Sequence, residues 1–282
     1  MSQHLAPHVE DLEVEAIELD LLVEAIHRRY GAEFRGYART SLKRRVRQFM
    51  GEERVRSISE LQEIVLRNPA VFARLRDHFS VGVTALFRDP SFYVAFRQKV
   101  VPHLWASPLV RVWCAGCATG EEVYSVAIVL IEEQLFDRAR IYATDLNDHL
   151  IEKARRGIYE ARWMQEYEQN YAAAGGRAKL SDYFQYGYDG AIFRKRFRRN
   201  TVFAQHNLAT DGSFNEFNVI LCRNVMIYFG RALQHRVHDL LHQSLRRGGF
   251  LCLGRRESLG QSSHAVAYEA VDDEERIYRR RR

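Results

Sequence analysis

This chain of 282 residues contains few cysteines and prolines and has no long apolar run. Its four cysteines do not make a disulfide framework in so long a chain, and its five prolines exclude a collagen-like repeat. No stretch without a charged residue exceeds the 11 residues of 100–110, so no segment is expected to span a bilayer. The first 20 residues are acidic and lack the basic and then apolar layout of a signal peptide. The protein is therefore expected to be cytoplasmic, with no direct membrane insertion.

The composition is that of a folded protein, with 46% apolar and 12% aromatic residues, enough for one large domain or two modest ones. The 42 Lys or Arg and 36 Asp or Glu leave a net charge of +6. This balance favours an acidic partner but is too mild to indicate nucleic acid. The excess is concentrated in residues 27–56, where ten Lys or Arg stand against three Glu. A basic helix that docks onto a partner and a solvated helix face are both consistent with this excess.

Apolar periodicity divides the chain into three regions. Residues 12–79 repeat apolar side chains at helical spacing, so 1–80 is predicted to be a small all-helical domain. Residues 81–108 are predicted to be a linker and a helix. From 109 to 282, β-rich runs alternate with helical segments, which predicts an α/β fold with a parallel sheet covered by helices. A Tyr-, Gly- and Arg-rich stretch at about 178–201 fits neither period and is predicted to be a small inserted β subdomain. The expected strands are 110–114, 140–144, 201–206, 218–222 and 249–253, followed by a hairpin of 265–270 and 276–280.

A turn of small residues follows the first expected strand, within RVWCAGCATGEEVYS at Arg111–Ser125. The small side chains of Ala115 and Gly116 let a ligand approach the backbone, and the helix that begins near Glu121 offers unpaired N–H groups. The next expected strand ends in Asp145, where a carboxylate is well placed to bind ribose hydroxyls in a doubly wound fold. These features predict an adenosine-type site at the carboxyl edge of the sheet.

The glycine spacing of this turn is G-x-x-x-G, which differs from the G-x-G-x-x-G of dinucleotide sites. Glu121 and Glu122 would repel a pyrophosphate but suit a cationic ligand that carries hydroxyls. S-adenosylmethionine fits, because it has ribose hydroxyls, an ammonium and a sulfonium, and no phosphate. Two alternatives stay open: a tight turn without a cofactor, and a redox or zinc role for the C-x-x-C of Cys114 and Cys117.

Two further segments place polar residues at expected element boundaries. In VILCRNVMIYF, at Val219–Phe229, an apolar strand is followed at once by Arg223 and Asn224. In VTALFRDPSF, at 83–92, Thr84 and Arg88 precede the parallel domain. Strand ends of this kind carry function in open α/β sheets.

Considered together, these segments resemble the chemotaxis receptor glutamate O-methyltransferases, the CheR family, over nearly the whole chain. The matching motifs are T-x-x-F-R at Thr84–Arg88, AGCATGEEVYS at Ala115–Ser125, A-T-D at Ala143–Asp145, N-L at Asn207–Leu208 and CRNVMIYF at Cys222–Phe229. The resemblance implies a Rossmann-like S-adenosylmethionine-dependent methyltransferase domain that follows a small all-helical N-terminal domain.

The resemblance also implies residue roles. The cofactor would be held by Thr84, Arg88, Ala115, Gly116, Glu122, Asp145, Asn207, Leu208, Arg223 and Asn224. Asp145 would bind the ribose hydroxyls, and residues 207–208 would flank the adenine. Arg88 and Tyr228 would act at the reaction centre, where a methyl group passes to a glutamate oxygen and gives a γ-methyl ester. A glutamate has a pKa of about 4.3 and is ionised at neutral pH, so no general base is needed.

The implied partner is the cytoplasmic helical-bundle region of methyl-accepting chemoreceptors. Arg39, Lys43, Arg44 and Arg47 of the basic segment would dock onto its glutamates. The chain is expected to act as a monomer, without nucleic acid. No metal site is expected, since His235, His238 and His242 share a helix face without a carboxylate at ligand spacing.

The sequence departs from the family at three places. Gly82 stands where asparagine is usual, Leu86 replaces the first phenylalanine of F-F-R, and the late G-H-S-E is Gly254-Arg255-Arg256-Glu257. These changes bear on cofactor affinity and substrate preference more than on the reaction type. Two rival functions remain: a regulatory module that binds without catalysing, and a methyltransferase for another substrate such as RNA.

Overall fold

The computed structural model describes residues 9–79, 82, 84–188, 190–260 and 262–282, and side chains from residue 13 onward. The chain forms two compact units. The first takes in the N-terminal region up to residue 81 together with Tyr228–Leu233, and the second takes in Gly82–Ile227 and Gln234–Arg282. Within the described ranges, no helix has the length and apolarity that crossing a membrane requires.

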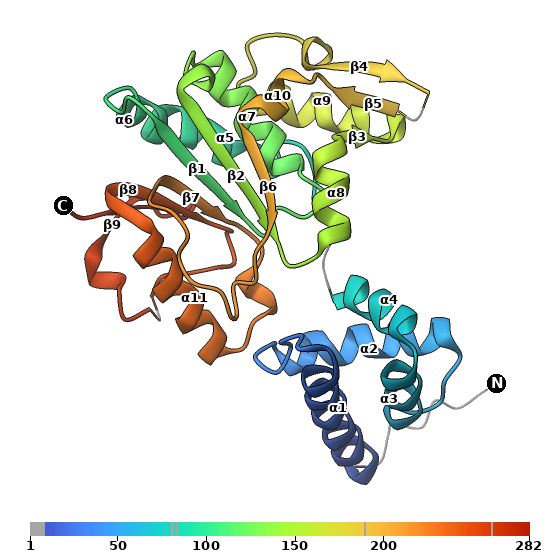
Figure 1. Ribbon diagram of the computed structural model, residues 1–282. Coiled ribbons are helices and arrows are strands. Elements are labelled where there is room, and N and C mark those ends of the chain that lie inside the picture. Colours follow the sequence, from blue (N-terminus) through green and yellow to red (C-terminus); the bar gives the residue numbers. More distant parts are fainter. Residues whose placement is uncertain (1–8, 80–81, 83, 189, 261) are drawn as a thin grey trace. The chain divides into compact units, whose positions relative to one another are not determined.

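The first unit contains the helices that the periodicity of residues 12–79 predicts. They are α1 (Val9–Tyr30), α2 (Arg39–Glu53), α3 (Ile58–Arg67) and α4 (Pro69–Phe79) (Figure 1). The Ser57 hydroxyl accepts the Glu60 N–H and so caps α3, while proline suits the first turn of α4 because that position needs no N–H donor. Each helix contributes fully buried apolar side chains to one core, among them Leu22, Val46, Leu61 and Leu75.

A segment distant in sequence, Tyr228–Leu233, belongs to this first unit. The Ala38 N–H donates to the Tyr228 carbonyl oxygen at 2.9 Å. Tyr37 and Phe229 form an antiparallel bridge, and their ring centroids lie 5.0 Å apart. The residues at the end of the CRNVMIYF motif are therefore held by the helical unit.

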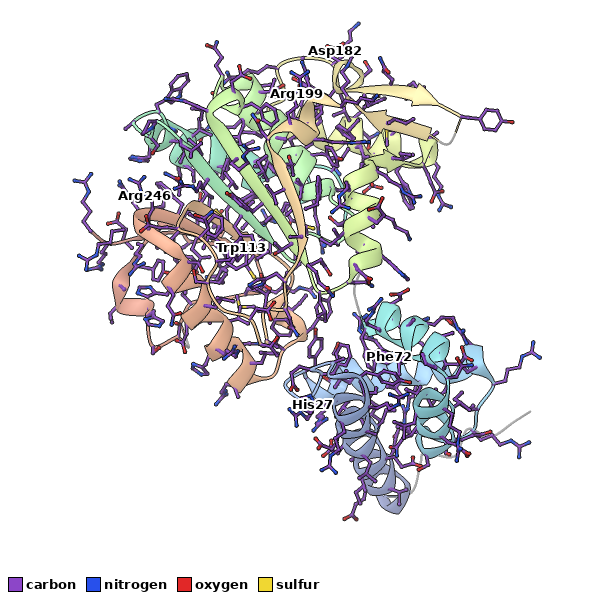
Figure 2. All side chains as sticks on the ribbon, in the orientation of Figure 1. His27, Phe72, Trp113, Asp182, Arg199 and Arg246 are labelled. Atoms are coloured by element: carbon purple, nitrogen blue, oxygen red, sulfur yellow. The ribbon has the colours of Figure 1, made fainter. Side chains whose placement is uncertain are left out.

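The second unit contains a seven-stranded sheet in the order β6-β2-β1-β7-β8-β10-β9. Its strands are β1 (Val110–Ala115), β2 (Ala139–Asp145), β6 (Thr201–Gln205), β7 (Phe217–Cys222), β8 (Leu245–Leu253), β9 (Tyr268–Asp272) and β10 (Ile277–Arg280). The first five strands in the sheet order pair in parallel, and β10 pairs antiparallel with β8 and β9. Trp113, labelled in Figure 2, is fully buried and donates its indole N–H to the Thr144 hydroxyl at 2.8 Å, which ties β1 to β2. The predicted parallel sheet with a terminal hairpin is confirmed.

The helices of the second unit follow the expected alternation. They are α5 (Pro90–Ala95), α6 (Val101–Leu104), α7 (Glu121–Glu132), α8 (Asp148–Arg156), α9 (Met164–Ala173), α10 (Arg196–Arg199) and α11 (Arg231–Ser244), with a π-helical turn at Phe96–Val100. The first three residues of α11 group with the helical unit. In the region predicted to be a linker and a helix, Phe87, Phe92 and Tyr93 are fully buried in the same apolar cluster as the sheet strands.

A second, three-stranded sheet has the order β3-β5-β4, with β3 (Ile158–Tyr159), β4 (Phe184–Gly187) and β5 (Gly190–Phe193) (Figure 1). The small β subdomain expected at about 178–201 supplies two of these strands. The third, β3, lies earlier in the chain and pairs antiparallel with β5. A strand of two residues carries too little periodicity to be read from sequence, so the expected range leaves out part of this sheet.

Candidate functional site

Apart from Thr84 and Arg88, the expected cofactor residues lie at or after the ends of strands that finish at one edge of the main sheet. Because β6, β2, β1 and β7 are parallel, their carboxyl ends lie together, with Asp145 opposite Gln205 and Ala115 opposite Thr144. Such an edge is where open α/β sheets bind ligands.

The turn after β1 has an unusual backbone that its small residues permit. Gly116 and Gly120 have φ of +76° and +93°, which favours glycine. The Gly116 N–H donates to the Thr144 carbonyl oxygen at 2.8 Å. A Cβ on Gly116 would lie 2.5 Å from the side chain of Val225, which is too close for a non-bonded contact. The turn after β1 therefore packs against the residues after β7 too closely for any side chain at position 116. Ala118 also has a positive φ, of 48°, and its N–H donates to Asp145.

Asp145 accepts backbone hydrogen bonds on both carboxylate oxygens. Oδ2 accepts the Ala118 N–H at 2.9 Å and Oδ1 accepts the Asn147 N–H at 3.0 Å. Burial raises the pKa of Asp145, and the N–H groups of Asn147, Ala118 and Leu146 oppose that rise. A carboxylate offers about four acceptor positions, so Asp145 keeps acceptor capacity for hydroxyl groups.

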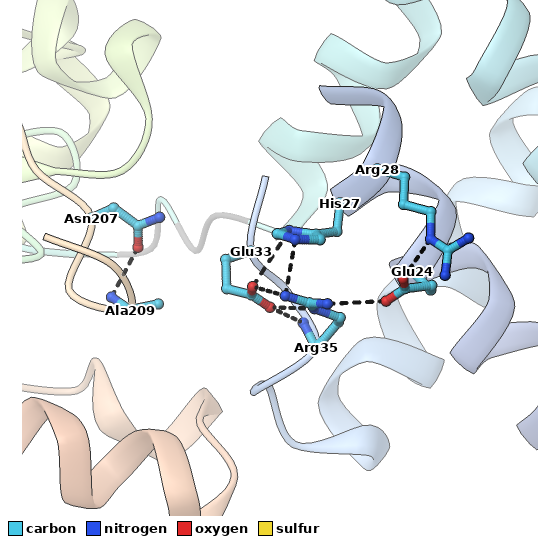
Figure 3. Close-up of polar contacts among 7 residues, drawn as sticks. All are labelled: Glu24, His27, Arg28, Glu33, Arg35, Asn207 and Ala209. Carbon is cyan, nitrogen blue, oxygen red and sulfur yellow. Dashed lines mark hydrogen bonds and ion pairs between the residues drawn. The ribbon is translucent and has the colours of Figure 1, made fainter. Parts of the chain in front are cut away.

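The segment after β6 lies against Asp145, whose carbonyl oxygen accepts the His206 N–H at 3.1 Å. Asn207 folds this segment into a turn, since its Oδ1 accepts the Ala209 N–H at 2.9 Å (Figure 3). Leu208 is buried and apolar, the character expected of a residue beside an adenine ring.

Arg223 forms a buried ion-pair network with two carboxylates. It donates to Glu122 Oε2 at 3.2 Å and to Asp89 Oδ2 at 2.9 Å, and its guanidinium lies 3.9 Å from the centroid of the Phe92 ring. Burial raises the pKa of Glu122, and the Arg223 cation opposes that rise. The Arg223 Nε is buried and has no hydrogen-bond partner among the described residues. Glu122 and Arg223, both expected to hold the cofactor, thus contact each other.

Thr84 and Arg88 line a cavity of about 870 Å³ in the second unit. Its other lining residues come from the chain before α5, the start of α7, the end of α8 and the stretch from β3 into α9: Gly82, Ala85, Thr119, Glu121, Lys153, Arg156, Ile158, Tyr159, Glu160, Trp163, Glu166 and Tyr167. Glu121 is buried, which raises its pKa, and it accepts the Thr119 hydroxyl at 2.7 Å. The Tyr159 hydroxyl donates to the Thr119 carbonyl oxygen at 2.8 Å, so the small sheet is bonded to the residues that precede α7.

Tyr228 lies in the segment that groups with the first unit. The guanidinium of Arg45 lies 5.0 Å from its ring centroid. Its role at a reaction centre with Arg88 stays a prediction.

The basic segment 27–56 consists of the last turn of α1, a loop, α2 and the three residues after it, and acidic residues of α1 pair with several of its cations. Arg39 pairs with Asp20 at 2.7 Å, while Lys43 and Arg47 pair with Glu15 at 2.5 and 2.6 Å. At the end of α1 and in the following loop, Arg28 pairs with Glu24, and Arg35 pairs with Glu24 and Glu33 (Figure 3). Arg44 makes no ion pair within the described part of the chain. Of the four expected docking residues, Arg39, Lys43 and Arg47 therefore already pair with carboxylates of α1, whereas Arg44 does not.

The redox alternative finds no support in the C-x-x-C pair. Cys114 and Cys117 are free and buried, and burial raises the pKa of both thiols well above the ordinary value. Reactive cysteines have the opposite property, a lowered pKa and solvent access.

Glu257 is a residue whose role the sequence did not reveal. It is 5% exposed, and its carboxylate accepts backbone N–H groups from the residues that follow both β7 and β8. The signal was present as a glutamate three residues after a glycine at a strand end, in Gly254-Arg255-Arg256-Glu257.

Comparison with known proteins places the chain in a family. Residues 82–273 match the family described as CheR methyltransferase, SAM binding domain, and residues 17–80 match CheR methyltransferase, all-alpha domain. Cher3 of Pseudomonas putida is 44% identical over 264 residues, which cover 94% of this chain and 97% of that protein. The chemotaxis protein methyltransferase of Listeria innocua is 28% identical over 247 residues, which cover 86% of this chain and 91% of that protein. Chemotaxis protein methyltransferase 1 of Pseudomonas aeruginosa is 27% identical over 231 residues, which cover 76% of this chain and 80% of that protein. The chain, with an all-helical domain followed by a Rossmann-like domain that binds S-adenosylmethionine, belongs to the CheR methyltransferases.

Proposed function

We propose that this methyltransferase esterifies glutamate side chains in the cytoplasmic helical-bundle region of a methyl-accepting chemoreceptor, giving γ-methyl esters in signal adaptation. The observation that carries the proposal is Arg88, whose cation lines a cavity beside the start of α7. A guanidinium there suits an anionic acceptor, because its planar fork binds a carboxylate through two parallel hydrogen bonds. Support comes from relatives that are themselves named chemotaxis protein methyltransferases.

The donor set at the sheet edge fits S-adenosylmethionine. Asp145 keeps acceptor capacity for the ribose hydroxyls, and Gly116 keeps the turn free of a side chain. The carboxylates of Asp145 and Glu122 favour a ligand with an ammonium and a sulfonium over one with phosphates. The unpartnered Arg223 Nε would find an acceptor on a bound group, and we propose that Thr84, Arg88, Ala115, Asn207, Leu208 and Asn224 complete this site.

The chemistry asks little of the chain beyond placement. When bound, S-adenosylmethionine supplies an electrophilic methyl group on a cationic sulfur. The acceptor carboxylate is ionised at neutral pH, so no residue has to remove a proton while the carbon–oxygen bond forms and the carbon–sulfur bond breaks, with its electron pair left on sulfur. Arg88 orients that carboxylate, and the Tyr228 hydroxyl donates a hydrogen bond to it. Both residues act through alignment and charge placement.

Replacing Asp145 with alanine tests the cofactor assignment. The change removes the acceptor for the ribose hydroxyls and the partner of the Ala118 N–H, so S-adenosylmethionine affinity is expected to fall by ~1.5–3 kcal/mol, roughly 10- to 150-fold in Kd. Titration calorimetry measures the affinity, and Asp137→Ala, at an exposed position before β2, is the control. Unchanged affinity in a folded Asp145→Ala protein would remove this residue from the site.

Reversing the charge of Arg44 tests receptor docking. Because Arg44 is not paired with α1, Arg44→Glu is expected to slow receptor methylation roughly threefold to tenfold and leave cofactor affinity intact. Arg67→Glu makes the same change at an exposed position at the end of α3, where Arg67 pairs with Glu63 of the same helix, and serves as the control. The wild-type rate is also expected to fall as salt screens the encounter, and a rate indifferent to ionic strength would end the electrostatic docking proposal.

The function itself is tested with labelled S-adenosylmethionine and membranes that hold one chemoreceptor at a time. Transfer of label to receptor, with release of methyl groups by mild base, is the expected result, since methyl esters are base-labile. A protein that binds cofactor and receptor without transferring label would be a regulatory module. Label that appears in RNA instead of receptor would identify the other rival.

A further inference from the structure

The carboxylate of Glu257 uses its full acceptor capacity on backbone. Its Oε2 accepts the N–H groups of Asn224 at 2.9 Å and Gly254 at 2.6 Å, and its Oε1 accepts those of Val225 at 2.8 Å and Met226 at 2.7 Å. A carboxylate offers about four acceptor positions, so none is left for a ligand. Whatever Glu257 contributes, it contributes through the residues that it holds.

Gly254 allows this arrangement because it has no side chain. A Cβ there would lie 2.7 Å from the Asn224 nitrogen and 2.7 Å from Glu257 Oε2, too close for either atom to stay in place. The end of β8 and the residues after β7 can therefore approach each other only through a glycine. Neither Glu257 nor Gly254 is among the expected cofactor or catalytic residues.

The backbone that Glu257 holds lies at the edge of the sheet where the cofactor is expected. Asn224 has a φ of +60°, in the left-handed region that few residues other than glycine and asparagine adopt. The next residue, Val225, lies against Gly116, with its side chain 2.5 Å from the position a Cβ would occupy. Arg223, directly before, pairs with Glu122 at the start of α7. Fixing residues 224–226 thus fixes where the segment after β7 meets the turn after β1.

We propose that Glu257 and Gly254 form a clamp that positions Arg223 and Asn224 for S-adenosylmethionine, with Glu257 as a positioning residue. The inference rests on the proposed function only in taking these two residues as cofactor ligands. Glutamine at 257 would turn an NH₂ group toward backbone N–H donors and leave at least two of them without an acceptor. Aspartate would keep the charge but is one methylene shorter.

The test compares Glu257→Gln, Glu257→Asp and Gly254→Ala with the wild type and with Glu269→Gln, the same chemical change at an exposed position of β9. Calorimetry gives the Kd for S-adenosylmethionine, steady-state methylation of a receptor gives kcat and the cofactor KM, and thermal melting reports the fold. Glu257→Gln and Gly254→Ala are expected to raise the Kd and KM for the cofactor roughly tenfold or more. The Kd and KM of Glu257→Asp should lie between those of these two variants and those of the wild type. The KM for receptor should stay unchanged, and Glu269→Gln should match the wild type throughout.

A residue that only stabilises the fold would lower the melting temperature and leave the cofactor Kd and KM of the folded protein as they were. That result in Glu257→Gln, or in Gly254→Ala and Glu257→Asp if the glutamine variant fails to fold, overturns the clamp. Failure of the proposed function looks different. A wild type that binds S-adenosylmethionine but does not methylate receptor leaves the clamp standing, since it is measured by cofactor affinity, and a wild type that does not bind the cofactor overturns both.

Discussion

Arg88→Ala is expected to lower the rate of methyl transfer by about 10²–10³ at saturating cofactor, the usual loss when an oriented donor is removed from a reaction centre. The guanidinium supplies both a charge and a planar pair of donors on the wall of the cavity, and alanine supplies neither. Arg88→Lys restores the charge without the fork, so it should recover only part of the rate. Ester formation on receptor measures turnover. Arg140→Ala is the control, because Arg140 is exposed and lies near the start of β2, away from the sheet edge that holds Asp145.

Tyr228→Phe separates the two expected reaction-centre residues. It removes one hydroxyl and keeps the ring that contacts Arg45, so the fold should persist and turnover should fall less than in Arg88→Ala. Near wild-type turnover in Tyr228→Phe would make the tyrosine a structural contact of the helical unit and leave Arg88 as the only catalytic residue. Wild-type turnover in Arg88→Ala as well would contradict the reaction centre altogether.

The sequence carried enough information to predict the main sheet and the edge where its site lies. The central strands β1 and β7 are almost wholly buried, and the β-rich runs alternate with helical segments, which are strong local signals. Gly116 and Asp145 could be placed at the same edge because parallel strands leave no other arrangement. The hydrogen bond from the Ala118 N–H to the Asp145 carboxylate shows that the turn after β1 and the end of β2 are in contact at this edge.

What the sequence could not supply depends on contacts between distant segments. The strand β3 has two residues and exists only through its pairing with β5. The motif predicts Tyr228 at the reaction centre, but nothing in the sequence indicates that its carbonyl oxygen accepts the Ala38 N–H or that its ring lies near the Arg45 guanidinium. The charge of residues 27–56 could be counted, but not its neutralisation by Glu15 and Asp20, which lie outside that window.

Arg223→Met is expected to destabilise the second unit by about 3–5 kcal/mol, because removing one partner leaves the other charge buried and uncompensated. The side chain of Arg223 is 2% exposed, and it faces Glu122 and Asp89 at once. Methionine keeps the apolar contact with Phe92 while it removes the cation, so loss of packing is kept small. Chemical denaturation with far-ultraviolet circular dichroism measures the free energy of unfolding, and Arg140→Met, at an exposed position, controls for the loss of one positive charge.

The pH dependence of this variant identifies the cause. Burial already raises the pKa of Glu122 above its ordinary value of 4.5, and Arg223 opposes that rise more than Arg88 does. A group whose pKa is raised on folding stabilises the folded state most below its unfolded pKa, and that contribution is lost as pH rises toward the folded value. The loss of unfolding free energy in Arg223→Met relative to the wild type should therefore be small near pH 4 and grow as pH rises above about 4.5. The double variant Glu122→Gln with Arg223→Met should recover part of the loss at neutral pH, since no unpaired charge is then buried at position 122. A deficit of equal size at every pH, with no recovery in the double variant, would assign the loss to packing around Phe92 instead of to the buried charge.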